Sequence, residues 1–329
     1  MDAIHLLLGN ACNKRCPYCL QDEFAHTKKA DFDVFEEKFR RYVAERGLTA
    51  NAVHYWGGEP LLYRKTLYRS VGLCDELFPG ATLHRITTNG TLVDDDYVAF
   101  CNANPKVHTV VSIHEFEIPD ENWRMIGRLE RVSVSGVVHK GRPSPYSYYE
   151  EWRRACSLAG KPLHIGLYPI HATDGADPST WLTKQDVDAF FAELLFVMLG
   201  RTERCAYSRS VIANFQFTDA KYRAEALKPK CFNDEVLSID LFGNQFACHH
   251  NNALGNRLHN IFEGKKYIPI QEQRSSRYFD SEECRACPAF PSCHGGCYLT
   301  NTHDVECYWN KTQWAFEEYT RHCRNEVSD

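Results

Sequence analysis

The sequence contains no long uninterrupted apolar segment and no excess of charge of one sign. Its longest apolar run, Phe190–Leu199, includes Glu193 and falls short of the roughly 18 uncharged residues of a membrane-spanning helix. No signal peptide precedes the first polar loop. The 38 Lys and Arg residues nearly balance the 43 Asp and Glu residues, which leaves a net charge of −5. These absences predict a cytoplasmic protein that needs no membrane, and they argue against one that mainly coats nucleic-acid phosphates.

Cysteine, in contrast, is abundant, with 15 in 329 residues. Disulfide scaffolds are usually short and secreted, whereas this chain is long, has an odd number of cysteines and carries no export signal. Eight of the 15 cysteines lie in residues 231–329, and three more are grouped near the N-terminus. Ligation of metal or of an iron–sulfur cluster is therefore the better interpretation.

Short β-rich runs alternate with helical stretches over the first 200 residues, which predicts an α/β fold. The predicted strands are Ala3–Leu8, Ala52–Trp56, Thr82–Thr87, Val107–Ile113, Val132–His139 and Leu163–His171. The predicted helices are Asp33–Arg46, Tyr63–Leu77, Asp94–Asn102, Tyr146–Gly160 and Lys184–Gly200. About six strand–helix units suit parallel strands closed into a partial barrel, the (β/α)6 relative of a TIM barrel. Polar loops follow the strands, where α/β barrels place their chemistry.

The pattern changes after residue 200. Residues 201–230 are mixed and charged, which predicts a linker, and residues 231–329 are punctuated by cysteines and predict a second, smaller domain. A hairpin is expected over Leu237–Cys248, with its turn at Phe242-Gly243-Asn244. The aromatic stretch Tyr308–Cys323 predicts a final helix that docks on the rest of the chain.

Three cysteines, Cys12, Cys16 and Cys19, stand within eight residues in the first polar loop. A structural zinc ion or an ordinary four-iron cluster takes four protein ligands, so a trio indicates one iron left open for a small molecule. The spacing C-x3-C-x2-C, with an aromatic residue before the last cysteine, resembles the signature of radical S-adenosylmethionine (radical SAM) enzymes. The resemblance implies a [4Fe-4S] cluster with S-adenosylmethionine on the open iron and Tyr18 packed beside both. The alternative is a zinc site whose fourth ligand comes from another part of the chain.

The loop after the second predicted strand reads Gly57-Gly58-Glu59-Pro60. It resembles the GGEP motif of the same family, which implies that its backbone edge and its Glu receive the methionine ammonium. Glycine lets a backbone approach a ligand closely, and a carboxylate accepts hydrogen bonds from an ammonium. A plain turn is the alternative reading.

Two further loops agree with this resemblance. Thr88 and Asn89 belong to a segment similar to the family's TNG segment, and Ser112 resembles a serine that contacts the ribose. Ser112 is followed by Ile113, His114 and Glu115, whereas Asp-Gly is commoner in the family, so the role of that loop stays open.

The C-terminal cysteines resemble the SPASM domain, which holds auxiliary iron–sulfur clusters in radical SAM enzymes. The resemblance implies one or two auxiliary [4Fe-4S] clusters. Their ligands would be Cys284, Cys287, Cys293 and Cys307 for the outer cluster and Cys231, Cys248 and Cys297 for the inner one. Cys205, Cys323, substrate or water could complete the inner set. Zinc knuckles are the alternative. The remaining Cys74, Cys101 and Cys156 lie on helical stretches as small apolar residues.

The resemblance implies reductive cleavage of S-adenosylmethionine to a 5′-deoxyadenosyl radical, an electron donor such as flavodoxin or ferredoxin, and hydrogen-atom abstraction from a C–H bond. This is oxidoreductase-type or isomerase-type chemistry. His249 is the expected proton carrier, because an imidazole titrates near neutral pH. A capping role for the His249-His250 pair is as good an explanation.

The expected substrate is a peptide or protein side chain. Only eleven residues precede Cys12, which leaves no room for an N-terminal leader-binding domain and weakens that expectation. A small molecule or an amino-acid-modified nucleobase in DNA is the alternative, for which the segment Tyr146–Tyr149, with Lys140 and Arg142, could stack a base and meet a phosphate. A zinc-binding scaffold is the remaining, non-enzymatic class.

Overall fold

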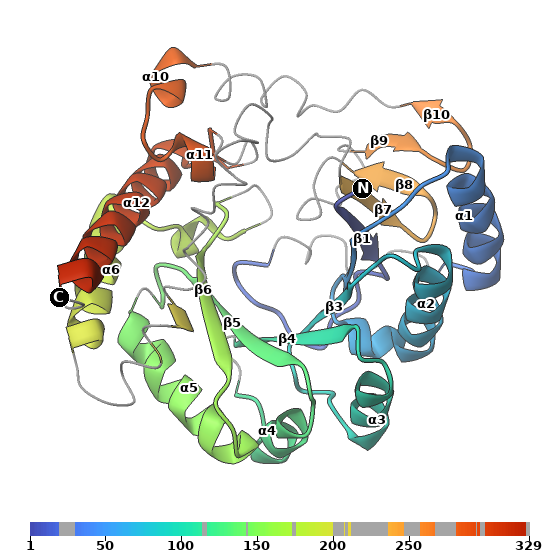
Figure 1. Cartoon of the computed structure of the whole chain (residues 1–329), viewed down its shortest axis with the longest axis horizontal. Helices are drawn as coiled ribbons and strands as arrows, with labels where there is room; N and C mark the ends of the chain where they lie inside the picture. Colours follow the sequence, from blue (N-terminus) through green and yellow to red (C-terminus); the bar gives the residue numbers. More distant parts are fainter. Residues whose placement is uncertain are drawn as a thin grey trace. The chain divides into compact units, whose positions relative to one another are not determined.

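The computed structural model describes residues 1–19, 30–113, 117–142, 144–172, 176–199, 207, 210–211, 236–246, 257–266, 281–293, 295–296 and 300–326 (Figure 1). The chain forms two compact units. The first comprises Met1–Ser133, Leu158–Lys161 and Cys231–Glu272, and the second comprises Val134–Ser157, Pro162–Lys230 and Gln273–Asp329. The domain boundaries expected at residues 200 and 230 stay a prediction.

The first unit contains a sheet in the order β10-β9-β8-β7-β1-β2-β3-β4. Its strands are β1 (Ala3–Leu7), β2 (Ala52–Trp56), β3 (Leu83–Thr88), β4 (Val107–Ile113), β7 (Val236–Asp240), β8 (Asn244–Phe246), β9 (Arg257–Asn260) and β10 (Lys265–Lys266). Strands β7, β1, β2, β3 and β4 are parallel, and β8 to β10 run antiparallel to their neighbours. The predicted hairpin thus extends the N-terminal sheet, because Ile4 of β1 pairs with Leu237 of β7.

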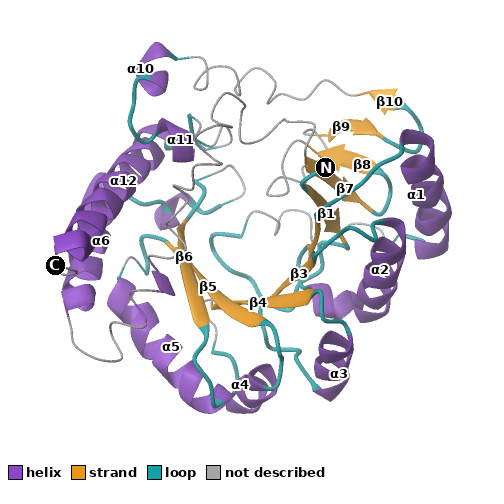
Figure 2. Cartoon of the chain, viewed as in Figure 1, coloured by secondary structure: helices purple, strands orange, loops and turns teal. Residues whose placement is uncertain are grey.

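Helices α1 (Phe32–Arg46), α2 (Arg64–Leu77) and α3 (Asp95–Ala103) cover one side of strands β1 to β4 (Figure 2). Asp31 caps α1 by accepting from the Asp33 and Val34 N–H groups, and Gly47 ends the helix with φ of 56°. Along α1 the buried residues are Phe32, Phe35, Phe39 and Val43. They recur at helical spacing, which is why this stretch forms an amphipathic helix.

Two local features of the first unit differ from the sequence expectation. The helix predicted over Tyr63–Leu77 is preceded by a 3-10 turn, η2 (Pro60–Tyr63), with Glu59 at its cap. A short helix, α4 (Asp120–Gly127), follows β4, although the sequence predicted no helix between the strands Val107–Ile113 and Val132–His139. No side chain caps α4, and burial of Trp123 and Ile126 supports it instead, so its sequence carried little local signal.

The second unit carries β5 (Val132–Val138), which begins in the first unit, and β6 (His164–Pro169). Its helices are α5 (Pro145–Ala159), η3 (Pro178–Thr180), α6 (Lys184–Leu199), α10 (Glu282–Arg285), α11 (Phe290–Cys293) and α12 (His303–Glu326). The final helix α12 starts five residues earlier than predicted and packs on α6. Its Trp309 ring lies 4.8 Å from Phe190 and 5.1 Å from Phe191 between centroids. Among the described helices, none has the length and apolarity to span a membrane.

Candidate active site and auxiliary-cluster cavity

The loops that follow β1, β2 and β3 lie at one edge of the first unit's sheet, because the three strands are parallel neighbours. The loop after β1 is hydrogen-bonded to the loop after β2. The Gly58 N–H donates to Gly9 O at 2.9 Å, and the Glu59 N–H donates to Ala11 O at 2.9 Å. These bonds continue the β1–β2 pairing past the ends of the strands. The cysteine loop and the GGEP segment are therefore held side by side.

Gly58 has no space for a side chain. A Cβ atom there would lie 2.2 Å from Ala11 O and 2.5 Å from Asn10 O. Neighbouring Gly57 has φ of 149°, and its Cβ would meet Gly9 O at 2.2 Å. Glycine is required at both positions because the two backbones approach each other too closely for any other residue.

We expect Gly58→Ala to displace the cysteine loop and to lower the free energy of unfolding by about 1–3 kcal/mol, the usual cost of overpacking. Urea denaturation and iron content after anaerobic reconstitution measure the two effects. The matched control is Gly72→Ala in α2, where an added Cβ meets nothing within 4 Å and stability should rise by up to about 1 kcal/mol. A Gly58→Ala protein with wild-type stability and iron content would contradict this geometry.

The Glu59 carboxylate joins the loop after β2 to the loop after β3. It is 1% exposed. Its Oε1 accepts from the Leu61 N–H at 2.9 Å and from the Thr88 hydroxyl at 2.7 Å, and its Oε2 accepts from the Asn89 N–H at 2.8 Å. Burial raises the pKa of Glu59, and these hydrogen bonds oppose the rise. The carboxylate that the sequence assigns to an ammonium thus also anchors Thr88 and Asn89, and its part in ammonium binding stays a prediction.

Glu59→Gln should lower the free energy of unfolding by about 1–3 kcal/mol, because an amide NH₂ in place of one oxygen would face a donor in a buried site. Equilibrium urea denaturation measures the change. Glu37→Gln is the control, since Glu37 is 72% exposed and pairs with Arg41 on the surface of α1, and its effect should stay within about 0.5 kcal/mol. Equal denaturation midpoints for the two variants would rule out the anchoring role.

Cys12 is tied to the loop after β3. Its Sγ accepts from the Lys14 N–H at 3.4 Å and from Asn89 Nδ2 at 4.0 Å. Asn89 Nδ2 also donates to Asn13 Oδ1 at 2.8 Å, and Asn13 Nδ2 donates to Thr91 Oγ1 at 2.9 Å. Burial raises the pKa of Cys12, and the hydrogen bonds from Lys14 and Asn89 lower it. N–H groups aimed at the sulfur favour the thiolate, which is the form that binds metal.

Cys16 and Cys19 lie on the same short loop. The Cys19 N–H donates to Cys16 O at 2.9 Å, which closes a turn between them. Both are half-buried, and Tyr18 between them is 7% exposed. Three thiols on one loop, with hydrogen-bond donors beside the first, fit an iron–sulfur cluster that takes three protein ligands.

Ser112 lies near the C-terminal end of β4. The register pairs Val111 with Thr88, so Ser112 reaches the same edge of the sheet as Asn89. Ser112 is half-buried. His114 lies outside the described residues.

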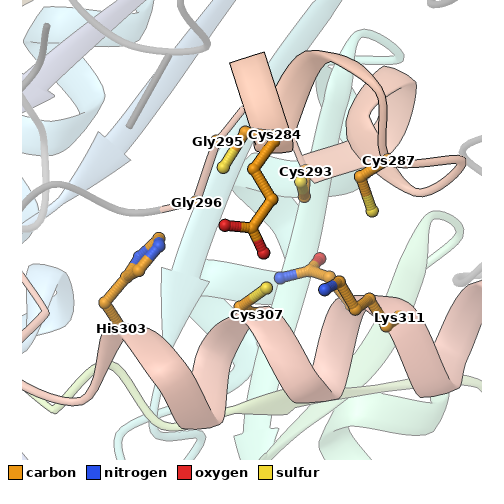
Figure 3. Close-up of a pocket in the computed structure, with 10 residues that line it drawn as sticks. Cys284, Cys287, Cys293, Gly295, Gly296, His303, Cys307 and Lys311 are labelled. Atoms are coloured by element: carbon orange, nitrogen blue, oxygen red, sulfur yellow. The ribbon is translucent and has the colours of Figure 1, made fainter. Parts of the chain in front are cut away.

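Four predicted ligands of the second unit line one cavity that is partly open to solvent (Figure 3). Cys284, Cys287 and Cys293 come from α10, α11 and the turn between these helices, and Cys307 comes from α12. The Cys287 N–H donates to Cys284 O at 3.0 Å, which folds this segment tightly. Figure 3 shows these three cysteines facing Cys307 across the cavity. The donor set suits an auxiliary cluster with four thiolate ligands.

The thiols of this cavity are electrostatically coupled. Burial, with smaller effects from the neighbouring Cys287, Cys307 and Cys284, raises the pKa of Cys293 to about 11. Burial also raises the pKa of Cys307, while Lys311 lowers it. Each thiol must lose its proton to bind metal, so metal binding by these cysteines would depend on pH.

His303 and Lys311 also line this cavity, and the sequence reasoning missed them. They stand four residues before and four residues after Cys307, so all three lie on one face of α12. That spacing was the available signal. A Cβ on Gly296 would lie 3.3 Å from the His303 ring, so the glycine turn packs closely against that imidazole.

Several predicted site residues lie outside the described residues, namely His249, Cys205, Cys231, Cys248 and Cys297, and of Cys323 only the backbone is described. The ten cysteines with described side chains form no disulfide. Within the same described part, no three His, Cys, Asp or Glu side chains are grouped so that they could hold one metal ion. The four cysteines of the cavity need not converge in that way, because in a four-iron cluster each cysteine binds a different iron.

The aromatic segment that could stack a base has internal contacts in the second unit. Arg142 pairs with Glu151 at 2.5 Å, and its guanidinium lies 4.0 Å from the centre of the Tyr148 ring. Tyr148 and Tyr149 are buried, whereas Tyr146 is 42% exposed. Arg142 is thus already neutralised by a carboxylate, which makes it a poor partner for a phosphate.

The N-terminal part of the chain is similar in sequence to known proteins. Residues 6–132 match the model of the Radical SAM superfamily. A stretch of 103 residues is 32% identical to the GTP 3′,8-cyclase of Chlorobaculum tepidum and covers 31% of this chain and 30% of the cyclase. Another, of 90 residues, is 37% identical to the GTP 3′,8-cyclase of Stenotrophomonas maltophilia and covers 27% of each chain. The chain thus matches less than a third of the length of these relatives.

Two solved structures share the fold. Native anSMEcpe with bound AdoMet and Cp18Cys peptide matches with a TM-score of 0.68 and 16% identity, over 99% of this chain and 98% of that one. SuiB of Streptococcus suis bound to its precursor peptide SuiA matches with a TM-score of 0.61 and 14% identity, over 90% of this chain and 72% of that one. The chain therefore has an α/β fold, and its residues 6–132 match the radical SAM superfamily. The protein is an enzyme.

Proposed function

We propose that this enzyme cleaves S-adenosylmethionine reductively and uses the resulting radical to abstract a hydrogen atom from a substrate C–H bond. The supporting observation is the hydrogen-bonded assembly of three loops, in which Gly58 and Glu59 bind the cysteine loop while Asn89 donates to Cys12. Cys12, Cys16 and Cys19 would hold the cluster. When bound, that cluster supplies the electron that splits the sulfonium and releases a 5′-deoxyadenosyl radical.

The residues around this loop assembly bind and orient the cofactor. The backbone edge at Gly57 and Gly58 would accept the methionine ammonium, with Glu59 holding that edge in place and adding its negative charge. Ser112, at the same edge of the sheet, would contact the ribose. Thr88 and Asn89 would line the site from the loop after β3, with Asn89 also donating to the Cys12 sulfur.

The cysteine cavity of the second unit supports a SPASM-type auxiliary [4Fe-4S] cluster on Cys284, Cys287, Cys293 and Cys307. The inner ligands Cys231, Cys248 and Cys297 are proposed on the sequence pattern alone, and they imply a second cluster. Such clusters suit oxidation, because they can accept an electron from a substrate radical.

A peptide or protein side chain is the proposed substrate class. Two proteins of the same fold were solved with peptides bound, anSMEcpe and SuiB. The identity to GTP 3′,8-cyclases favours a small molecule as the second candidate. Neighbouring genes separate the two: a short repetitive or cysteine-rich reading frame favours a peptide, and DNA-modification genes favour a nucleobase.

His249 is the proposed proton carrier. His249→Gln should leave substrate-independent 5′-deoxyadenosine formation at the wild-type rate and slow product formation by about 10²-fold, the lower range for loss of a general acid or base. The measurement compares the two rates by liquid chromatography. Product formation at the wild-type rate would remove His249 from the mechanism.

Anaerobic reconstitution followed by assay with a chemical reductant tests the enzyme class. We expect reductant-dependent conversion of S-adenosylmethionine to 5′-deoxyadenosine, and roughly eight to twelve irons per chain at four per cluster. Stoichiometric zinc with little iron would favour the scaffold alternative. A fully loaded protein that does not cleave the cofactor would contradict the proposal.

A further inference from the structure

A row of polar residues crosses the first unit's sheet at one level. The register aligns Ser238, His5, His54, Arg85 and His108 on the adjacent strands β7, β1, β2, β3 and β4. Central strands of a parallel sheet usually read as continuous apolar runs. A polar residue at the same level of five such strands is therefore a feature that the fold does not require.

The row lies on the face of the sheet that the helices leave uncovered. Tyr55 donates its hydroxyl proton to Ser70 O of α2 at 3.4 Å, and the Thr109 hydroxyl lies 2.9 Å from the Tyr97 hydroxyl of α3. These residues face the helices. His84 of β3 also faces α2, because its Nε2 lies 3.6 Å from Asp75 Oδ1. Side chains alternate along a strand, so His54, Arg85 and His108, each next to one of these residues in its strand, point to the opposite face.

The row combines one cation with flanking imidazoles. Arg85 is exposed, and none of the described residues forms a salt bridge with it. On one side His54 stacks on His5 with ring centroids 4.7 Å apart, and on the other His108 Nε2 lies 3.0 Å from Ser133 Oγ. Adjacent strands are about 4.8 Å apart, so these groups are within reach of one small ligand.

His5 and His54 add hydrogen-bond donors to the row without adding charge. Burial, and then the Arg85 charge, lower the pKa of His5 to about 4. Burial, with smaller effects from His5 and Arg85, lowers the pKa of His54 to about 3. Both rings are neutral at pH 7, and each neutral ring carries one N–H donor. The row thus combines the guanidinium of Arg85 with neutral N–H donors, and such groups bind a phosphate or a carboxylate.

The row also stands in a fixed relation to the proposed cofactor loops. His5, His54, Arg85 and His108 each lie four residues before a residue of those loops, respectively Gly9, Gly58, Asn89 and Ser112. An even offset keeps both sets on one face, and four residues of strand span about 13 Å. A substrate held at the row by one end would extend toward the cofactor site with the other.

We propose that Arg85, flanked by His54 and His108, binds an anionic group of the substrate, a phosphate or a carboxylate. Its assignment to the substrate rests on the proposed function, whereas anion binding itself does not. The reacting carbon would then lie several bonds away from the anionic group.

Isothermal titration calorimetry on the reconstituted full chain, without S-adenosylmethionine, tests the row with inorganic phosphate and with acetate in separate arms. We expect saturable binding of at least one anion, and the arm that binds identifies the source of the group. Arg85→Met should weaken binding about tenfold or more, because it removes a charged hydrogen-bond donor. His54→Asn should weaken it several-fold. Arg41→Met, a surface arginine paired with Glu37, should bind as the wild type does.

Wild-type binding by Arg85→Met, or binding of neither anion by the wild type, would overturn the proposal. If Arg85→Met does not fold, as judged by circular dichroism, the anion titration is done with Arg85→Lys and His54→Asn instead. Unchanged anion binding by both of these variants would also overturn the proposal. Cofactor cleavage is measured separately on the wild type. If the wild type does not cleave the cofactor, the proposed function is wrong, and the anion titration still tests whether the row binds an anion.

Discussion

We expect Cys16→Ala to abolish 5′-deoxyadenosine formation and to lower the iron content by about four atoms per chain, the content of one cluster. The loop keeps its shape in this variant, because the turn is made by the Cys19 N–H and the Cys16 carbonyl and not by the thiol. The loss is therefore one of ligation. Iron and sulfide assays, with chromatography of the reaction products, measure both outcomes.

The control is Cys101→Ala in α3. Cys101 is 7% exposed and its sulfur lies 3.7 Å from Thr109 Oγ1, so it packs as a small core residue. Its replacement should cost about 1 kcal/mol of stability and no iron. If Cys16→Ala retains wild-type iron and cofactor cleavage, the trio does not hold the cluster. If both variants lose iron equally, the iron loss reflects instability and not ligation.

The sequence predicted strands β1 to β6 well because each is a short β-rich run followed by a polar loop. Strands β2 and β4 have the predicted bounds, and β1 ends one residue early, at Leu7. Helix α4 was missed because its stability comes from buried Trp123 and Ile126 and not from a cap. Local patterns predict elements that local interactions specify, and they fail where tertiary packing decides.

The candidate site likewise has features that the local sequence predicts and features that it does not. The spacing of Cys284, Cys287 and Cys293 is local, and these cysteines line one cavity with Cys307. The anchoring of Thr88 by Glu59 joins residues 29 positions apart. A motif within one loop cannot predict a hydrogen bond between two loops. The row around Arg85 depends on register between strands, which the sequence pattern did not provide.

Cys307→Ala is the second variant with a large expected effect. It removes one of four thiols from the cavity of the second unit and leaves a site that cannot close around a four-iron cluster. We expect the iron content to fall by about four atoms per chain. Substrate-independent cleavage of S-adenosylmethionine should persist, because its proposed ligands lie in the first unit. Product formation should stop.

We expect helix α12 to stay docked when the Cys307 thiol is removed, so that cluster loss and unfolding can be told apart. The Trp309 ring packs on Phe190 and Phe191, and the Tyr308 hydroxyl donates to Asp188 Oδ1 at 2.7 Å. Circular dichroism should therefore show wild-type helix content in the Cys307→Ala protein. Its thermal midpoint should fall, since a cluster that binds only the folded chain stabilises it.

Cys156→Ala is the matched control in the second unit. Its sulfur accepts from the Leu163 N–H at 3.3 Å and lies outside the cysteine cavity. We expect it to keep all of its iron and to form product. Full iron in Cys307→Ala would assign the fourth ligand elsewhere, with Cys323 the next thiol to replace. If Cys307→Ala loses both cofactor cleavage and product formation, the two cluster sites do not assemble independently.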